Sequence, residues 1–124
     1  MGKSNSLLCD TNVLVYFVDG NINAGEYFQN YDITFSAITY IEVLSNNKLS
    51  TERRELLKDF LTTFTFIETS PLINNLTVNM RLNYKLDTPD GIIAATAKYL
   101  DVPLLTYDSA FFKIKEIQVI PFSK

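Results

Sequence analysis

Short apolar runs alternate with longer segments of helical periodicity along most of the chain. The runs lie at 7–9, 33–35, 64–67, 104–106 and 117–120. Each is apolar at nearly consecutive positions, which is typical of strands covered on both faces, as in a parallel sheet. The pattern therefore predicts short strands in a mostly parallel sheet.

The segments between these runs have the features of helices. They lie at 12–18, 24–30, 39–46, 51–63, 71–84 and 89–100. The first is expected to be capped by Asp10 or Thr11 and the last by Thr88. Strands that alternate with helices predict an α/β sandwich. The length of 124 residues fits one domain, 1–124, with a polar N-terminal tail at 1–6.

Two of the helical segments have apolar residues at helical spacing, which are expected to face the core. In 51–63 and just beyond it these are Leu56, Leu57, Phe60, Leu61 and Phe64. In 71–84 they are Leu72, Leu76, Met80 and Tyr84.

The composition limits the chemistry that the chain can perform. It has no histidine and one cysteine, which excludes histidine-based catalysis, Ser-His-Asp triads and structural zinc. Cys9 is expected to be buried as a small apolar residue. A single cysteine favours a reducing, cytoplasmic compartment for the protein. No apolar run approaches the length of about 20 residues that spans a membrane. Any metal site must use oxygen ligands, which favours Mg²⁺, Mn²⁺ or Ca²⁺.

Four acidic residues that are distant in the sequence are expected near one edge of the sheet. Asp10 follows the first strand and Asp108 the fourth. Glu42 lies in the helix after the second strand, and Asp90 in the first turn of the helix that leads into the fourth. Open parallel sheets bind ligands at the carboxyl ends of their strands. Two anions about 4 Å apart repel by roughly 4 kcal/mol, so acids clustered without Lys or Arg partners indicate a divalent cation.

Each acid also has a purely structural interpretation. Asp10 and Asp108 are suited to cap the helices that follow them. Asp90 is suited to stabilise a helix N-terminus, and Glu42 to lie in solvent. The site hypothesis therefore depends on the joint placement of the acids.

Four sequence motifs resemble those of the PIN domain family, in the family's order and spacing. They lie at 8–14 (LCDTNVL), 36–44 (SAITYIEVL), 89–97 (PDGIIAATA) and 104–108 (LLTYD), with Phe111 after the last. Together they cover about 7–122, and four motifs in register are a far more specific signal than one. Within the family, the chain most resembles the single-domain VapC-type toxins of toxin–antitoxin pairs.

The resemblance implies a three-layer α/β/α fold and cleavage of RNA, possible substrates being tRNA and rRNA, with one or two Mg²⁺ or Mn²⁺ ions. The family's acidic positions fall on Asp10, Glu42, Asp90 and Asp108. Asp87 is a rival for the third of these. The supporting polar positions fall on Asn12, Ser36 or Thr39, and Thr106. The resemblance also implies a homodimer and a cognate antitoxin protein.

The net charge of −3 and the pI near 4.8 are not typical of a nucleic-acid binder. Much of the negative charge is expected to lie in the metal site, where cations cancel it. A basic rim could be formed by Lys48, Arg53, Arg54, Arg81, Lys85, Lys113 and Lys115. Most aromatic residues of the first two helices are expected in the core, and any exposed ones at an interface with a dimer partner or an antitoxin helix. The aromatic residues of these two helices are Tyr16, Phe17, Tyr27 and Phe28.

Two other functions fit parts of the pattern. A receiver-like phospho-acceptor domain also has acids at strand ends, but it requires an acidic pair after the first strand, where this chain has Asp10, Thr11 and Asn12. A non-catalytic PIN scaffold would bind RNA or protein without cleaving RNA. The complete set of acids argues against this scaffold.

Overall fold

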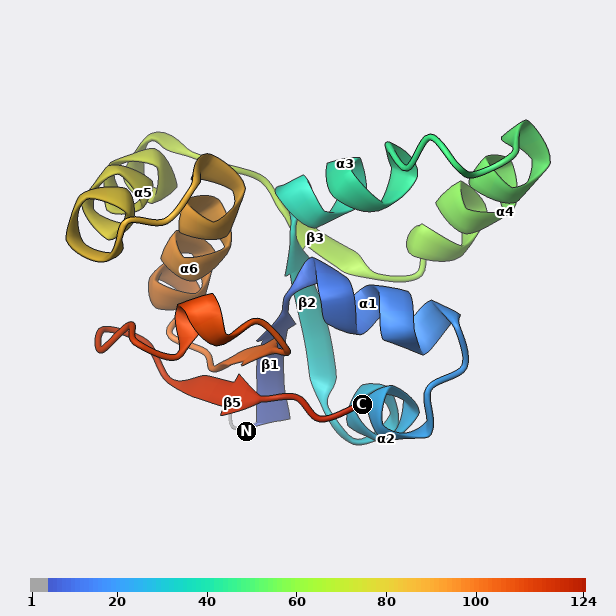
Figure 1. Cartoon of the computed structure of the whole chain (residues 1–124), viewed down its shortest axis with the longest axis horizontal. Helices are drawn as coiled ribbons and strands as arrows, with labels where there is room; N and C mark the ends of the chain where they lie inside the picture. Colours follow the sequence, from blue (N-terminus) through green and yellow to red (C-terminus); the bar gives the residue numbers. More distant parts are fainter. Residues whose placement is uncertain (1–4) are drawn as a thin grey trace.

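A parallel sheet of five strands forms the centre of the computed structural model, which describes residues 5–124 (Figure 1). The strands are β1 (Ser6–Cys9), β2 (Asp32–Ser36), β3 (Thr65–Ile67), β4 (Leu104–Thr106) and β5 (Val119–Pro121). Their order across the sheet is β3-β2-β1-β4-β5, and every neighbouring pair is parallel. The predicted α/β architecture is confirmed. The order differs from the 2-1-3-4-5 arrangement of receiver-like domains.

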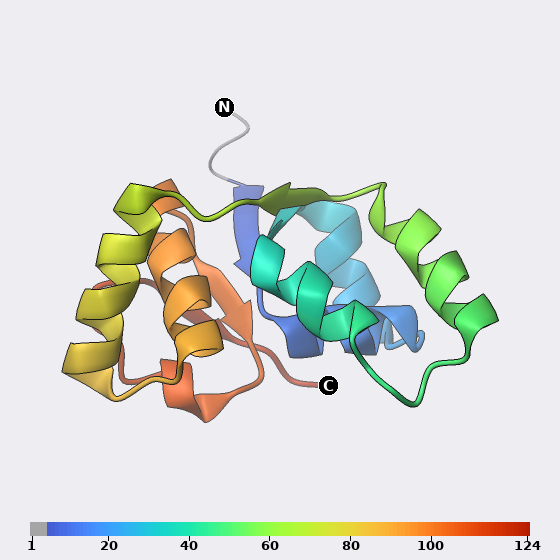
Figure 2. The same ribbon diagram turned by 90° about the horizontal axis from the view of Figure 1, so that it is seen from above.

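In the described part of the chain, six α-helices connect the strands. They are α1 (Thr11–Val18), α2 (Ile22–Asn30), α3 (Ala37–Leu44), α4 (Thr51–Leu61), α5 (Pro71–Tyr84) and α6 (Thr88–Leu100). A short 3-10 helix, η2 (Ser109–Phe111), follows β4. Figure 2 shows α5 and α6 on one side of the sheet and α1, α2 and α4 on the other, so the fold is the expected α/β/α sandwich. None of these helices is both long and apolar enough to cross a membrane.

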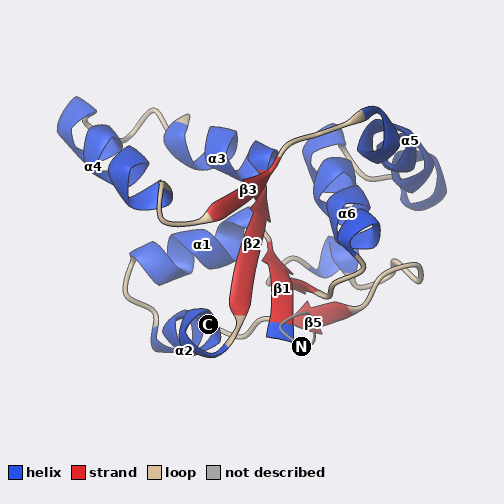
Figure 3. Ribbon diagram, turned by 180° about the vertical axis from the view of Figure 1, so that it is seen from behind, coloured by secondary structure: helices blue, strands red, loops and turns tan. Residues whose placement is uncertain are grey.

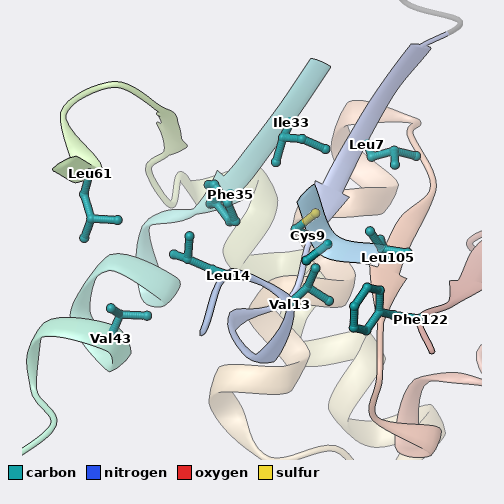
Figure 4. Packing of buried hydrophobic residues seen from close by; sticks show 11 residues of the cluster. Leu7, Cys9, Val13, Leu14, Ile33, Phe35, Val43, Leu61, Leu105 and Phe122 are labelled. Atoms are coloured by element: carbon teal, nitrogen blue, oxygen red, sulfur yellow. The ribbon is translucent and has the colours of Figure 1, made fainter. Parts of the chain in front are cut away.

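Figure 3 shows the strands between helices on both sides. Two apolar cores fill the spaces between these layers. Successive residues of a strand point to opposite faces. Leu7 and Cys9 therefore enter the core beside α1, with Phe35 from β2 (Figure 4), whereas Leu8 enters the core beside α5 and α6. Burial raises the pKa of the Cys9 thiol, in agreement with its predicted apolar role. The aromatic residues of α1 and α2 pack against the first core, as expected: they are Tyr16, Phe17, Tyr27 and Phe28.

The predicted elements occur in the predicted order, with shifted ends. β1 begins at Ser6, so the expected tail at 1–6 is shorter, and residues 1–4 of it lie outside the described residues. α4 ends at Leu61, not at position 63, because the hydroxyls of Thr62 and Thr63 donate to carbonyl oxygens of its last turn. β5 begins at Val119, after the turn at 115–117.

Most residues expected on the apolar faces of α4 and α5 are buried or pack against a core, and a few are exposed. In α4, Leu61 is buried, whereas Leu56 is 69% exposed. The buried side of α5 consists of Ile73, Thr77 and Met80, and Leu72 lies in solvent. Packing against α6 at Gly91 determines which side of α5 is buried. A β-carbon at Gly91 would lie only 2.9 Å from Cγ of Arg81 and 3.2 Å from Cγ2 of Thr77.

Candidate active site

The carboxyl ends of β1 and β4 meet in the middle of the sheet and define the candidate site. Cys9 is in register with Leu105, and the backbone N–H of Asp10 donates to the carbonyl oxygen of Leu105 at 3.0 Å. The chain winds outward from this pair of strands in both directions, through β2 and β3 on one side and β5 on the other. Such a switch point is where open α/β sheets bind ligands.

Asp10 is the buried centre of the site, with 5% of its surface exposed. Its carboxylate caps α1 by accepting the N–H of Thr11 at 2.7 Å. It also accepts Nδ2 of Asn12 at 3.1 Å and the hydroxyl of Thr106 at 2.7 Å. Burial raises the pKa of Asp10, and the hydrogen bonds from Thr106 and Thr11 oppose this effect. Asp10 therefore does cap α1, but its carboxylate also accepts two side-chain hydrogen bonds that the cap does not require.

Thr106 connects Asp10 to Asp108. Its buried hydroxyl donates to Oδ2 of Asp10 and accepts the backbone N–H of Asp108 at 3.0 Å. The Asp108 carboxylate accepts the N–H of Ala110 at 2.9 Å and so caps η2. The negative charge of Asp108 contributes to the raised pKa of Asp10. Thr106 thus holds two of the predicted acids in a fixed relation.

Glu42 is held by a residue that the sequence did not single out for the site. The hydroxyl of Thr11 donates to Oε1 of Glu42 at 2.6 Å and lies 3.0 Å from the hydroxyl of Thr39. Of the two supporting candidates in this region, Thr39 therefore belongs to the site's network. Ser36 instead caps α3 by accepting the N–H of Ile38. The position of Thr11 directly after Asp10, in the first turn of a helix, was the available signal.

Asp90 and Asp87 have distinct roles at the start of α6. Asp87 caps the helix by accepting the N–H of Asp90 at 3.0 Å, so the predicted cap at Thr88 is wrong by one residue. Within the described residues, the Asp90 carboxylate accepts no hydrogen bond. Burial and, after it, the charge of Asp87 raise the pKa of Asp90 to about 7.

The predicted acids influence one another electrostatically. The charges of Asp10, Asp108 and Glu42 each contribute to the raised pKa of Asp90. The charges of Asp108 and Glu42 likewise contribute to the raised pKa of Asp10. With Asp90 taken as the third acid, the predicted set has one acid from each of four segments: the N-cap of α1, α3, the first turn of α6 and the N-cap of η2.

Within residues 5–124, no basic side chain forms an ion pair with any of these acids. Across residues 5–124, the only ion pair joins Lys98 to Glu116, at the far end of α6. Two arginines expected in a basic rim bind backbone carbonyls instead. Arg54 donates to those of Leu44, Asn46 and Leu49, and Arg81 to that of Leu86. Arg54 therefore stabilises the loop between α3 and α4.

The oxygen atoms of the site suit a hard divalent cation chemically, but the side chains that carry them lie too far apart to surround one. These atoms are carboxylate and hydroxyl oxygens, which Mg²⁺ and Mn²⁺ prefer, and the unneutralised charges of the carboxylates repel one another. Over the described range 5–124, however, no three acidic or cysteine side chains lie close enough together to hold a metal ion. A cation bound here would have to draw the acids closer together.

Comparison with known proteins gives a consistent picture. The family model for the PIN domain matches residues 7–117. No curated protein sequence matches the chain. A toxin–antitoxin complex from Klebsiella pneumoniae contains a chain that is 30% identical, with a TM-score of 0.82, and the match covers 95% of this chain and 99% of that one.

More distant solved structures share the fold. A chain of DNA-bound VapBC from Salmonella typhimurium is 18% identical, with a TM-score of 0.82 and coverage of 94% of this chain and 97% of that one. A chain of FitAcB from Neisseria gonorrhoeae is 22% identical, with a TM-score of 0.78 and coverage of 92% and 96%. At these identities the likeness establishes the α/β/α architecture.

Proposed function

The chain belongs to the PIN domain family, and from this premise we propose that it is a divalent-metal-dependent endoribonuclease, the toxin of a VapBC-like toxin–antitoxin pair. The observation that carries the proposal is the group of four acids around Asp10. They come from separate segments, their charges contribute to the raised pKa of Asp10 and of Asp90, and they have no basic partner in the described residues. Repulsion among unpaired carboxylates destabilises the folded protein, and a bound cation would relieve it.

Asp10 and Asp90 are the proposed direct metal ligands. Asp10 is fixed in position by Thr106, Asn12 and the N–H of Thr11. The Asp90 carboxylate accepts no hydrogen bond from residues 5–124, which leaves its oxygens available to a cation. Bound Mg²⁺ or Mn²⁺ supplies Lewis acidity for hydrolysis of a phosphodiester bond.

The other side chains orient the site. Glu42 and Asp108 are proposed to ligate directly or through water. Thr11 restrains Glu42, with Thr39 next to it, and Thr106 restrains both Asp10 and the backbone at Asp108. Such outer contacts fix the direction of a ligating carboxylate.

The test is cleavage of structured RNA by the wild-type chain and by Asp10→Asn, each with Mn²⁺ and with a chelator. Cleavage by the wild type that requires Mn²⁺ and falls by at least about 100-fold in Asp10→Asn supports the proposal. Asp101→Asn, at the other end of α6, is the matched control and should retain activity. Equal cleavage by all three proteins would point to a contaminating nuclease. No cleavage by the wild type on any RNA would favour the non-catalytic scaffold.

The likeness to a chain from a toxin–antitoxin complex supports a protein partner. We propose a cognate antitoxin, encoded next to this chain, that inhibits cleavage. A homodimer is the oligomeric state that we expect from the family. Co-expression with the neighbouring open reading frame, followed by light scattering of the purified protein, tests both expectations.

A further inference from the structure

Two tyrosines that are close to site residues along the chain pack against each other and have no role in the site described above. Tyr107 stands between Thr106 and Asp108 in the chain, and Tyr16 lies one helical turn after Asn12 in α1. Their ring centroids are 5.8 Å apart, and the rings are nearly perpendicular at 75°. The pair therefore borders the site on the side of α1 and the β4–η2 loop.

Tyr107 is fixed through its backbone and open to solvent at its side chain. Its N–H donates to Oδ1 of Asn12 at 3.3 Å, and Asn12 in turn donates to Asp10. The residue nevertheless remains 44% exposed. An aromatic ring that is held at a site but not buried in the core is available to a ligand.

Tyr16 is supported from the core side. Its ring stacks on the ring of Phe122, at 5.8 Å and 27°, and Phe122 is itself buried. On the solvent side, Nζ of Lys124 lies 5.0 Å from the ring centroid of Tyr107 and 5.3 Å from that of Tyr16. The two rings thus combine an aromatic surface with a positive charge, and the backbone of Tyr107 is connected to Asp10 through Asn12.

We propose that Tyr107, backed by Tyr16, stacks with a base of single-stranded or looped RNA while Lys124 contacts a neighbouring phosphate. The inference rests on the proposed function and names the substrate contact that positions RNA at the acids. Aromatic rings bind unstacked bases of RNA in this way, largely independently of sequence.

The charge of the molecule favours this mode of binding. With a net charge of −3 and Arg54 bound to backbone carbonyls, electrostatic attraction to phosphates is weak for a nucleic-acid binder. Stacking does not depend on net charge. It would bring a phosphodiester next to Asp108 and Asp10, because Tyr107 is joined to both through its neighbours in the chain and through Asn12.

The absence of tryptophan from the chain allows a direct binding test. Tyr107→Trp introduces a single tryptophan, whose emission a stacked base would quench. The protein is titrated, in chelator so that no RNA is cut, with a mixed-sequence single-stranded RNA of about 12 nucleotides and with the same RNA as a duplex. We expect saturable quenching by the single strand and much less by the duplex. Tyr99→Trp, exposed on α6, is the control and should not be quenched.

Two further variants separate the ring from other roles of the residue. Tyr107→Ala should weaken binding of the single strand about 10-fold or more, whereas Tyr107→Phe, which keeps the ring, should bind like the wild type. In cleavage assays, Tyr107→Ala should raise KM more than it lowers kcat. Thermal unfolding checks that the variants are folded, and the Tyr107→Trp titration provides the answer if Tyr107→Ala is not.

The outcomes distinguish this inference from the proposed function. Saturable quenching without any metal-dependent cleavage would keep the stacking surface and refute the nuclease. Cleavage that is lost in Asp10→Asn but unchanged in Tyr107→Ala, without quenching, would keep the nuclease and overturn the stacking surface. Quenching by an arginine-rich peptide but not by RNA would assign the rings to a protein partner and also overturn it.

Discussion

Replacing Asp90 by asparagine should stabilise the metal-free protein, and the gain should increase with pH. The pKa of this carboxyl is raised from an ordinary 3.8 to about 7, first by burial and then by neighbouring negative charges. Because the folded-state pKa is above the unfolded one, ionisation of Asp90 disfavours the folded state. This cost is absent below about pH 4, grows between pH 4 and pH 7, and is complete above pH 7. Asparagine does not ionise, so this cost is absent in the variant.

The expected size follows from the same values. The difference between 3.8 and about 7 corresponds to roughly 4 kcal/mol at about 1.36 kcal/mol for each pH unit. Asp90 is only partly buried, and solvent screening reduces this to about 1–2 kcal/mol. The helix dipole at the start of α6 favours the ionised form by about 0.5 kcal/mol, so we expect a net gain of about 1 kcal/mol at pH 8. No hydrogen bond to the Asp90 carboxylate is lost in the described residues.

Urea unfolding at pH 4.5 and pH 8, in chelator, measures the effect. Asp90→Asn should be more stable than the wild type at pH 8 and nearly equal to it at pH 4.5. The matched control is Asp101→Asn, which removes one negative charge at the other end of α6 and keeps a residue type that tolerates the left-handed conformation there. A gain that is the same at both pH values, or that Asp101→Asn reproduces with the same pH dependence, would refute the reasoning. Added Mn²⁺ should stabilise the wild type and not the variant.

Three further substitutions test individual contacts. Thr106→Val removes a buried hydroxyl that donates to a carboxylate, and should lower the free energy of unfolding by about 1.5–3 kcal/mol in urea titrations. Gly91→Ala should destabilise the protein by about 1–3 kcal/mol in the same assay, because its β-carbon would lie 2.9 Å from the Arg81 side chain. An unchanged free energy of unfolding would show that α5 and α6 are not closely packed here. Arg54→Ala should cost about 2 kcal/mol through its lost hydrogen bonds to carbonyls, while Arg53→Ala, exposed in the same helix, should cost less than about 0.5 kcal/mol when both are unfolded in parallel.

The order of the strands and helices could be predicted from the sequence because periodicity is a local property. Consecutive apolar residues at 7–9 and 104–106 are sufficient to indicate strands buried on both faces. The four motifs also indicated the PIN domain family, which the match to the family model confirms. The ends of the elements were predicted less accurately. The hydroxyls of Thr62 and Thr63, for example, donate to backbone carbonyls and end α4 before its apolar pattern ends.

The sequence indicated the candidate acids and, through the family resemblance, Asn12, Thr39 and Thr106 as supporting residues, but it did not show which side chain each of them contacts. Thr106 and Asp10 are 96 positions apart and Thr11 and Glu42 are 31 apart, so no local pattern relates them. Ser36 and Thr39 were equivalent as supporting candidates until packing placed Thr39 beside Thr11 and left Ser36 as a cap.

The sequence alone therefore determined the succession of elements and the positions of the carboxylates at their ends, because each depends on a residue and its near neighbours. Only the tertiary structure decided which hydroxyl restrains which carboxylate, that Arg54 binds backbone carbonyls, and that the ring of Tyr107, which is 44% exposed, lies against that of Tyr16. These features depend on how strands and helices pack, and packing places residues together that are far apart along the chain.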